Sequence, residues 1–345
     1  MKKYIYLLTL ISALGACQHE ELTTTGIAKD HFYFENRGAT MPVYLEGNIS
    51  SNKILVMIHG GPGDGSLYYN TPEATDIAEK EFAIAYWDQR AAGISQGTTM
   101  NVNLRDYTND LKTLIVLLRN RYGAEKKIYL MAHSWGGLIT PMFLQEGNNQ
   151  SMVSGWIQVD GEHNYTMSDS LSRVNLLNYG REEIQSGRHT EDWQDIVNYC
   201  STHDPKDNYS VSRKINGFAH DSESYISQIA EGRSTSQNVK YFIRNYRYPI
   251  TTFISNGLYN NFVGEIDKQA YAENVSSKLN MITVPTLLLW GKYDFVCPVG
   301  LKDDITNRIS STDVNTVIFN HSGHSPMQNE PVAFWETVTG WVKSH

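Results

Sequence analysis

The stretch KIYLMAHSWGGLITPMF (residues 127–143) decides the fold. Its first half carries the apolar run IYLM, which is typical of a short buried strand. Its second half has apolar residues at helical spacing after two glycines, and this predicts a helix that packs back on the sheet. Ser134 stands at the corner between the two, held between a histidine and a tryptophan. A serine held out from the backbone at such a corner needs a reason.

Strands and helices alternate along the chain around this stretch. A hairpin is predicted from two early strands, and a helix from apolar residues at helical spacing over 103–122, with Asn103 as its N-cap. A final helix near the C-terminus carries two tryptophans and two valines. The predicted strands lie within residues 31–36, 41–47, 53–63, 82–90, 153–160, 284–291 and 315–324, the third ending in a glycine-rich turn and the last in a loop with two histidines. This alternation predicts an α/β fold with a mostly parallel sheet and helices on both faces.

Ser134 is a candidate nucleophile. A serine hydroxyl needs a base within hydrogen-bond reach and an acid that orients the base. The sequence around Ser134 differs from the Gly-x-Ser-x-Gly elbow of α/β-hydrolases in one small residue, Ala132, and in that fold the acid and then the histidine follow later strands. Asp294 follows the next-to-last predicted strand, and His321 and His324 follow the last. We choose His324, because it lies farther beyond the strand end and its loop resembles the histidine loop of that fold.

Acyl transfer also needs N–H donors that point at the developing oxyanion. The backbone N–H of Trp135, in the first turn of the helix after Ser134, is predicted to be one donor. The sequence HGGPG (residues 59–63) follows a buried strand, and its glycines let the backbone approach a substrate closely. We expect the second donor there, at Gly61 first and Gly60 next. We expect no metal and no cofactor.

Several motifs together resemble the proline iminopeptidase group of α/β-hydrolases. They are HGGPG, WDQRAAGIS (87–95) and HSWGG (133–137), combined with Asp294 and His324. This resemblance implies a metal-free hydrolase that removes an N-terminal residue, often proline, from a peptide or an amino-acid amide. Within the second motif, we interpret Asp88 and Arg90 as a structural pair that supports the pocket.

The alternation of strands and helices is interrupted after residue 162. We predict a mainly helical cap over 163–280 and a catalytic α/β-hydrolase domain built from 31–162 and 281–345. An insertion between strands covers the end of the sheet where ligands bind. In the resembled group, carboxylates of the cap hold the substrate's free amino group, and no residue matches them one by one. The candidates are Glu162, Glu182, Glu183, Glu223, Glu231 and Glu265.

Two other functions fit the same residues. The same three side chains could hydrolyse an ester or a lactone, because fold does not decide substrate. A lipid-anchored binding protein could keep the fold without the chemistry, although a complete Ser, Asp and His set argues against this. An epoxide hydrolase or dehalogenase is disfavoured, because those enzymes place Asp where Ser134 stands.

The N-terminus has the parts of an export signal. Two early lysines, an apolar stretch that ends at Leu14 and the tetrad LGAC that ends at Cys17 resemble a bacterial lipoprotein signal. We predict a signal peptide over residues 1–16, lipidation by palmitate and related acyl chains at Cys17, and a tether over 17–30. The predicted product is an exported lipoprotein, anchored to a membrane on its periplasmic or cell-surface side.

Composition excludes some partners. The formal net charge is −8, so the chain offers no basic surface for nucleic acid. The expected partners are instead a small peptide, amino-acid amide or ester as substrate, and a membrane through the lipid anchor. The chain has 345 residues, 41% of them hydrophobic, which suffices for a large core. So large a core does not require a disulfide, and we predict none between Cys200 and Cys297.

Overall fold

The computed structural model describes residues 26–97, 102–232 and 264–345. Their strands form one sheet in the order β1-β2-β4-β3-β6-β7-β8-β9, with β5 beside β2. The six strands from β4 to β9 along this order are parallel, which confirms the predicted mostly parallel sheet. The strands are β1 (Ile27–Asn36), β2 (Ala39–Asn48), β3 (Lys53–Ile58), β4 (Ala83–Trp87), β5 (Gln96–Gly97), β6 (Lys127–His133), β7 (Gly155–Val159), β8 (Thr286–Gly291) and β9 (Val314–Phe319).

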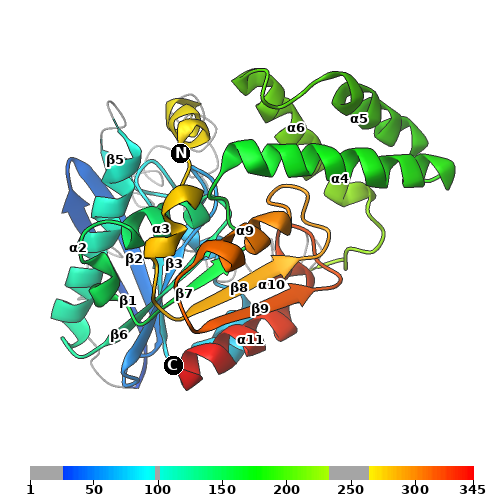
Figure 1. Ribbon diagram of the computed structural model, residues 1–345. Coiled ribbons are helices and arrows are strands. Elements are labelled where there is room, and N and C mark those ends of the chain that lie inside the picture. Colours follow the sequence, from blue (N-terminus) through cyan, green and yellow to red (C-terminus); the bar gives the residue numbers. More distant parts are fainter. Residues whose placement is uncertain (1–25, 98–101, 233–263) are drawn as a thin grey trace, which may run out of the picture.

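Helices lie on both faces of the sheet (Figure 1). The α-helices are α2 (Leu104–Tyr122), α3 (Gly136–Leu144), α4 (Tyr165–Gln185), α5 (Thr190–Thr202), α6 (Tyr209–Ser222), α9 (Gly300–Arg308), α10 (Pro326–Asn329) and α11 (Pro331–Ser344). Shorter turns of helix are η1 (Ser66–Tyr69), η2 (Ala74–Ala78), η3 (Asn149–Met152), η4 (Glu223–Tyr225) and η5 (Ser276–Met281). The early hairpin, β1 with β2, is antiparallel as predicted.

The side chains of β6 alternate between two hydrophobic cores. Ile128, Leu130 and Ala132 face the core that α2, α3 and α9 cover. Tyr129 and Met131 face the core that α11 and η2 cover. Side chains of a strand point alternately to opposite faces, so one short apolar run fills both cores. Each fully buried side chain of this size stabilises the fold by about 1.5–3 kcal/mol.

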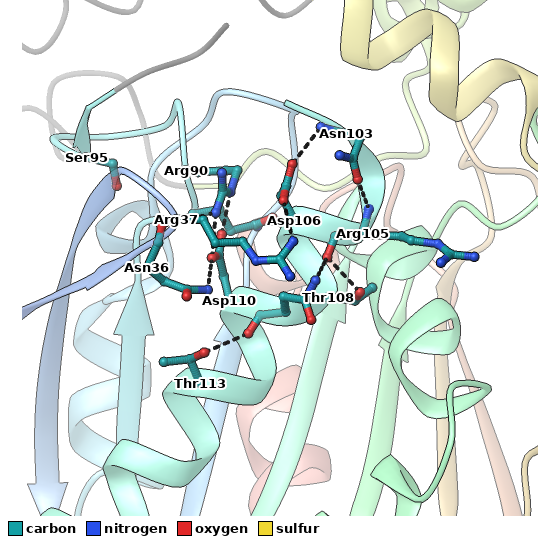
Figure 2. Close-up of polar contacts among 12 residues, drawn as sticks. Asn36, Arg37, Arg90, Ser95, Asn103, Arg105, Asp106, Thr108, Asp110 and Thr113 are labelled. Atoms are coloured by element: carbon teal, nitrogen blue, oxygen red, sulfur yellow. Dashed lines mark hydrogen bonds and ion pairs between the residues drawn. The ribbon is translucent and has the colours of Figure 1, made fainter. Parts of the chain in front are cut away.

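The predicted N-cap of α2 is confirmed. The Asn103 side chain accepts a hydrogen bond from the N–H of Arg105 at 3.0 Å, and the Asp106 carboxylate accepts one from the N–H of Asn103 at 3.0 Å. Figure 2 shows this reciprocal capping box at the start of the helix. Because the first N–H groups of a helix have no partner within it, the box fixes where α2 begins.

Arg90 is bound by Asp110 of α2, so the predicted pairing of Asp88 with Arg90 was wrong. The guanidinium donates Nε–H to Oδ2 of Asp110 at 2.6 Å and Nη2–H to Oδ1 at 2.7 Å, and Asn36 also donates to Oδ1 (Figure 2). Asp88 instead accepts from the N–H and the hydroxyl of Ser66. The two charged residues therefore attach the end of β4 to two different neighbours, α2 and η1.

The helices between β7 and β8 include α4, α5 and α6, drawn in green in Figure 1. The side chain of Ser168 on α4 donates to the carbonyl of Val296, which lies just after β8, so this group sits over the carboxyl end of the sheet. Residues 264–272 are also helical. The apolar side chains of α5 are buried; they are Trp193, Ile196, Val197 and Cys200. The aromatic-rich segment 241–253 lies outside the described residues.

The first strand begins earlier than predicted. Residues 27–30 belong to β1 rather than to the predicted tether, because they pair with β2 and the Asp30 carboxylate binds Arg121 and Tyr122 of α2. The predicted signal peptide and Cys17 lie outside the described residues. In the part of the chain that the structure describes, no helix has the length and apolar character needed to cross a membrane.

Cys200 and Cys297 are both buried as free thiols. The prediction that they form no disulfide is confirmed.

Candidate active site

Ser134 lies in a strained turn between β6 and α3. Its φ is 52°, a left-handed conformation that costs a non-glycine residue free energy. The turn fits only because small residues surround it. A Cβ at Gly136 would lie 2.3 Å from the carbonyl oxygen of Ile58, and one at Gly137 would lie 2.5 Å from the side chain of Gln158. The two glycines thus let the helix start close against β3 and β7, with the Ser134 hydroxyl directed to the ring of His324.

The structure brings Ser134, His324 and Asp294 together. Nε2 of His324 lies 2.9 Å from Oγ of Ser134, and Nδ1 lies 3.0 Å from Oδ2 of Asp294. The N–H groups of Val296 and Cys297 both donate to Oδ1 of Asp294 at 2.8 Å. Since a carboxylate accepts, Nδ1 of His324 carries the proton and Nε2 is free to accept from Ser134. Burial lowers the pKa of His324 to about 4, so the imidazole is a neutral base at neutral pH.

His321, the alternative to His324, lies outside this arrangement. Its side chain is exposed, and its N–H donates to the carboxylate of Glu330 at 2.8 Å. Its Nδ1 is 3.3 Å from the carbonyl oxygen of Gln228. The choice of the histidine farther beyond the strand end therefore agrees with the geometry.

Of the predicted oxyanion donors, Gly61 and Trp135 have an N–H that makes no hydrogen bond with a described residue. Trp135 directly follows Ser134, and Gly61 is exposed at the same end of the sheet. Gly60, the second choice in the loop, is unsuitable because its N–H donates to the Tyr69 hydroxyl at 3.0 Å. Two of the predicted donors, the N–H groups of Trp135 and Gly61, thus remain for an oxyanion.

Gln89 joins the two segments that carry these donors. Its side-chain amide donates to the carbonyl of His59 at 2.9 Å, and its amide oxygen accepts from the indole N–H of Trp135 at 3.1 Å. The backbone N–H of Gln89 donates to Nε2 of His59, so Nδ1–H of this ring donates to the carbonyl of Gly60. The motif after β4 therefore holds the glycine-rich loop against the helix that follows Ser134.

A second chain of hydrogen bonds connects the glycine-rich loop to His324. Nε2 of His133 lies 2.7 Å from the carbonyl oxygen of His324, and Nδ1 lies 2.7 Å from the Tyr69 hydroxyl. A carbonyl only accepts, so Nε2 of His133 carries the proton and Nδ1 accepts from Tyr69. The Tyr69 oxygen in turn accepts from Gly60. Burial lowers the pKa of His133 to about 3, which keeps this ring neutral and the direction of the chain fixed.

Two titratable side chains of the cap reach the candidate triad. Oε1 of Glu223 accepts a hydrogen bond from the N–H of His324, and the His220 ring packs edge-on against the His324 ring at 5.7 Å. Burial, aided by the charge of Asp294, raises the pKa of Glu223 to about 8. Burial lowers the pKa of His220 to about 4. Sequence reasoning missed His220, because no strand position placed it near the site.

One group of potential metal ligands occurs among the described residues. The ligand atoms of Asp294, Cys297 and His324 lie within 4.8 Å of one another. Asp294 and His324 already bond to each other, and His324 bonds to Ser134. Burial raises the pKa of Cys297 well above its usual value, so it remains a thiol rather than the thiolate that metals bind. This group does not fit a metal site.

Together, the sheet order, the elbow and the three aligned side chains define a hydrolase of α/β fold. The model of the family described as "alpha/beta hydrolase fold" matches residues 53–331, and the chain belongs to this family. The predicted fold is therefore confirmed.

Similar proteins of known sequence include a proline iminopeptidase of Saccharolobus solfataricus. It is 29% identical over 298 residues, which cover 85% of this chain and 85% of that protein. A probable aminopeptidase of Bacillus subtilis is 21% identical over 318 residues, 87% of this chain and 92% of that protein. The predicted resemblance to the proline iminopeptidase group is confirmed.

Solved structures with different activities share the fold. The proline iminopeptidase of Mycobacterium smegmatis has a TM-score of 0.60 at 12% identity and covers 92% of this chain and 98% of its own. An esterase from Exiguobacterium antarcticum has a TM-score of 0.58 at 18% identity and covers 93% and 100%. At these identities the likeness shows the fold alone.

We predict that Tyr69→Phe lowers the free energy of unfolding by about 1–3 kcal/mol, because it leaves the buried N–H of Gly60 and Nδ1 of His133 without a partner. Urea denaturation measures this loss. The matched control is Tyr129→Phe, since the Tyr129 hydroxyl is also buried but bonds to no described residue. Equal losses of unfolding free energy in the two variants would show that the hydrogen bonds of the Tyr69 hydroxyl do not stabilise the fold.

Proposed function

We propose that this protein is a serine hydrolase, and specifically an aminopeptidase of the proline iminopeptidase type. One observation carries the proposal of a serine nucleophile: Oγ of Ser134, both ring nitrogens of His324 and the carboxylate of Asp294 form a continuous chain at 2.9 and 3.0 Å. Nucleophile, base and orienting acid in this order are what acyl transfer by a serine requires. The N–H groups of Trp135 and Gly61, which bond to no described residue, also support it.

In the proposed acylation, Oγ of Ser134 attacks the substrate carbonyl carbon while Nε2 of His324 takes the hydroxyl proton. Asp294 keeps the ring in the correct tautomer and stabilises the imidazolium. The carbonyl oxygen becomes an oxyanion and accepts hydrogen bonds from the N–H groups of Trp135 and Gly61. The C–N bond of the substrate then breaks, the leaving amine takes the proton from His324, and the acyl group remains on the serine as an ester.

The proposed deacylation repeats these steps with water. His324 removes a proton from the water molecule as its oxygen attacks the acyl-enzyme, and the same two N–H groups hold the second oxyanion. The ester bond breaks, Ser134 regains its proton from His324, and the free amino acid leaves. Each cycle consumes one water molecule and returns all protein groups to their starting states.

The names of the relatives and a cap carboxylate support the aminopeptidase. A cationic amino group needs a counter-charge within a few ångströms. Five of the six predicted candidates are exposed or held by other partners. The carboxylate of Glu162, whose backbone bonds to Ser134, accepts from two backbone N–H groups, and Glu183 pairs with Arg188. Glu182, Glu231 and Glu265 are exposed. Glu223 contacts the loop of His324 and is the remaining candidate. An ammonium group that bound beside Glu223 would lower its raised pKa and so favour the ionised carboxylate.

The alternative is an ester or lactone hydrolase with the same triad. With a pKa of about 8, Glu223 is mostly protonated at neutral pH in the free protein. A neutral carboxyl group beside the triad suits an uncharged substrate. Substrate panels distinguish the two functions.

We predict that Ser134→Gly abolishes hydrolysis of every substrate while the protein stays folded. Glycine removes the hydroxyl and tolerates the φ of 52° at this position. Initial rates and a thermal melt of the variant and the parent chain give the comparison. Hydrolysis at the parent's rate would exclude Ser134 as the nucleophile and would favour a binding protein or a different site.

We predict that Glu223→Gln raises KM at least about tenfold for prolyl- and alanyl-arylamides with a free amino group, because an ion pair in a partly buried site is lost. The same variant should change KM little for N-blocked arylamides and for a short-chain aryl ester. The test uses the chain without residues 1–17, with Glu182→Gln as the control at an exposed cap position.

The parent's own preference decides between the two functions. Cleavage of unblocked but not blocked amides supports the aminopeptidase. Cleavage of the ester alone would discard the peptidase and keep the serine hydrolase.

We also propose that the protein is exported and anchored to a membrane by lipid on Cys17. The support is the sequence LGAC after a short apolar stretch. We predict that bacteria expressing the full chain incorporate labelled palmitate into it and retain it in the membrane fraction, and that Cys17→Ser loses both properties. An unlabelled parent chain would contradict the anchor without bearing on the hydrolase.

A further inference from the structure

Asp160 lies next to the proposed triad, directly after β7. The adjacent strand β8 runs parallel to β7 and leads to Asp294, so both residues lie at the same edge of the sheet. Asp160 is fully buried, and its N–H donates to the carbonyl of Leu289 at 2.9 Å. Oδ1 of its carboxyl accepts from the N–H of Gly291 at 2.8 Å. Its φ of 42° is unusual for a non-glycine residue, and such strain persists only where surrounding contacts hold it.

Among the described residues no N–H group donates to the buried second oxygen of Asp160, and the carboxyls of Asp160 and Asp294 are close enough for a side-chain hydrogen bond. Two ionised carboxylates only accept hydrogen bonds, so this contact requires one proton between them. Asp294 accepts from His324 and from the N–H groups of Val296 and Cys297. Within the part of the chain that the structure describes, one N–H group donates to the Asp160 carboxyl. The better stabilised anion is Asp294, which leaves the proton on Asp160.

We propose that Asp160 is a positioning residue of the triad: it stays protonated and donates its proton to Asp294, so that the pair holds one negative charge facing His324. This inference rests on the proposed function of Ser134. The donated hydrogen bond fixes the Asp294 carboxylate in the plane where it meets Nδ1 of His324. This hydrogen bond also makes the Asp294 carboxylate less basic, so the proton between Asp294 and His324 stays on Nδ1 of the imidazole.

The loop that carries Asp160 also contacts the nucleophile. The N–H of Ser134 donates to the carbonyl of Val159 at 3.2 Å, and the N–H of Glu162 donates to the carbonyl of Ser134 at 2.9 Å. A single segment, residues 159–162, therefore bonds to the serine on one side and the acid on the other. The backbone conformation at Asp160 therefore influences the distance between Ser134 and Asp294.

The charges around the pair agree with this assignment. Burial, followed by the charge of Asp294, raises the pKa of Asp160 well above its usual value, and Glu223 acts in the same direction. Burial also raises the pKa of Asp294, but the bonds from Cys297, Asp160 and Val296 and the ring of His220 oppose it. The backbone hydrogen bond from Gly291 opposes this rise for Asp160.

The test compares Asp160→Asn with Asp160→Gly. Asparagine can still donate to Asp294 and accept from Gly291 but carries no titratable proton, and glycine removes the side chain while it tolerates the positive φ. The readout is the rate at which a fluorophosphonate labels Ser134, followed with hydrolysis of the substrate the parent prefers. We expect Asp160→Asn to stay within about threefold of the parent and Asp160→Gly to lose about 10–100-fold in both rates, with KM little changed.

A loss in Asp160→Asn as large as in Asp160→Gly, or no loss in Asp160→Gly, would overturn the proposal. A parent chain that the probe does not label would instead count against the proposed function. Thermal melts show whether Asp160→Gly folds.

If Asp160→Gly does not fold, the pH profile of Asp160→Asn decides. Removal of a protonated Asp160 leaves the acid limb of kcat/KM in place, because the charge facing His324 is unchanged. Removal of an ionised Asp160 would lower the pKa of His324 and move the acid limb down by about one pH unit or more, which would overturn the proposal.

Discussion

The turn at Ser134 is the constraint on which the rest of the site depends. A non-glycine residue at a φ of 52° is held there only because Gly136 and Gly137 let α3 start against β3 and β7. Once the serine lies at the carboxyl edge of β6, the parallel order β6-β7-β8-β9 fixes which loops can meet it. The loops after β7, β8 and β9 carry Asp160, Asp294 and His324. The candidate triad is thus a consequence of strand order at one sheet edge.

Burial sets the charge state of this edge. His324, His133 and His220 all have lowered pKa values, and Glu223 has a raised one, so these four groups are mostly neutral at pH 7. Burial also raises the pKa of Asp294, the bonds from Cys297, Asp160 and Val296 oppose this rise, and we propose that its carboxylate holds the single negative charge at this edge. A neutral base beside a single buried anion is the state that general base catalysis needs before proton transfer. The surrounding neutral network fixes tautomers and positions without adding charges that would compete with Asp294.

Much of the fold and part of the site followed from sequence because they depend on local patterns. Each triad residue comes after a strand of the parallel part of the sheet, and parallel neighbouring strands end at a common edge, so their proximity could be predicted from order alone. The bond from Gly60 to Tyr69 could not, since it joins a loop to a short helix by tertiary packing. The same holds for Asp110, which looks like one more polar residue of an amphipathic helix until β4 brings Arg90 against it. Glu223 reaches the site only through the docking of the cap, for which no strand pattern exists.

The measurement that tests the central claim most directly is mass spectrometry of the chain quenched in acid during turnover of a slowly deacylating aryl ester. The account predicts an added mass equal to the acyl group, located after digestion on the peptide that contains Ser134. It also predicts that this mass disappears as the substrate is exhausted. Continued hydrolysis with the acyl group on another residue, or with no covalent intermediate under conditions that slow deacylation, would contradict the account.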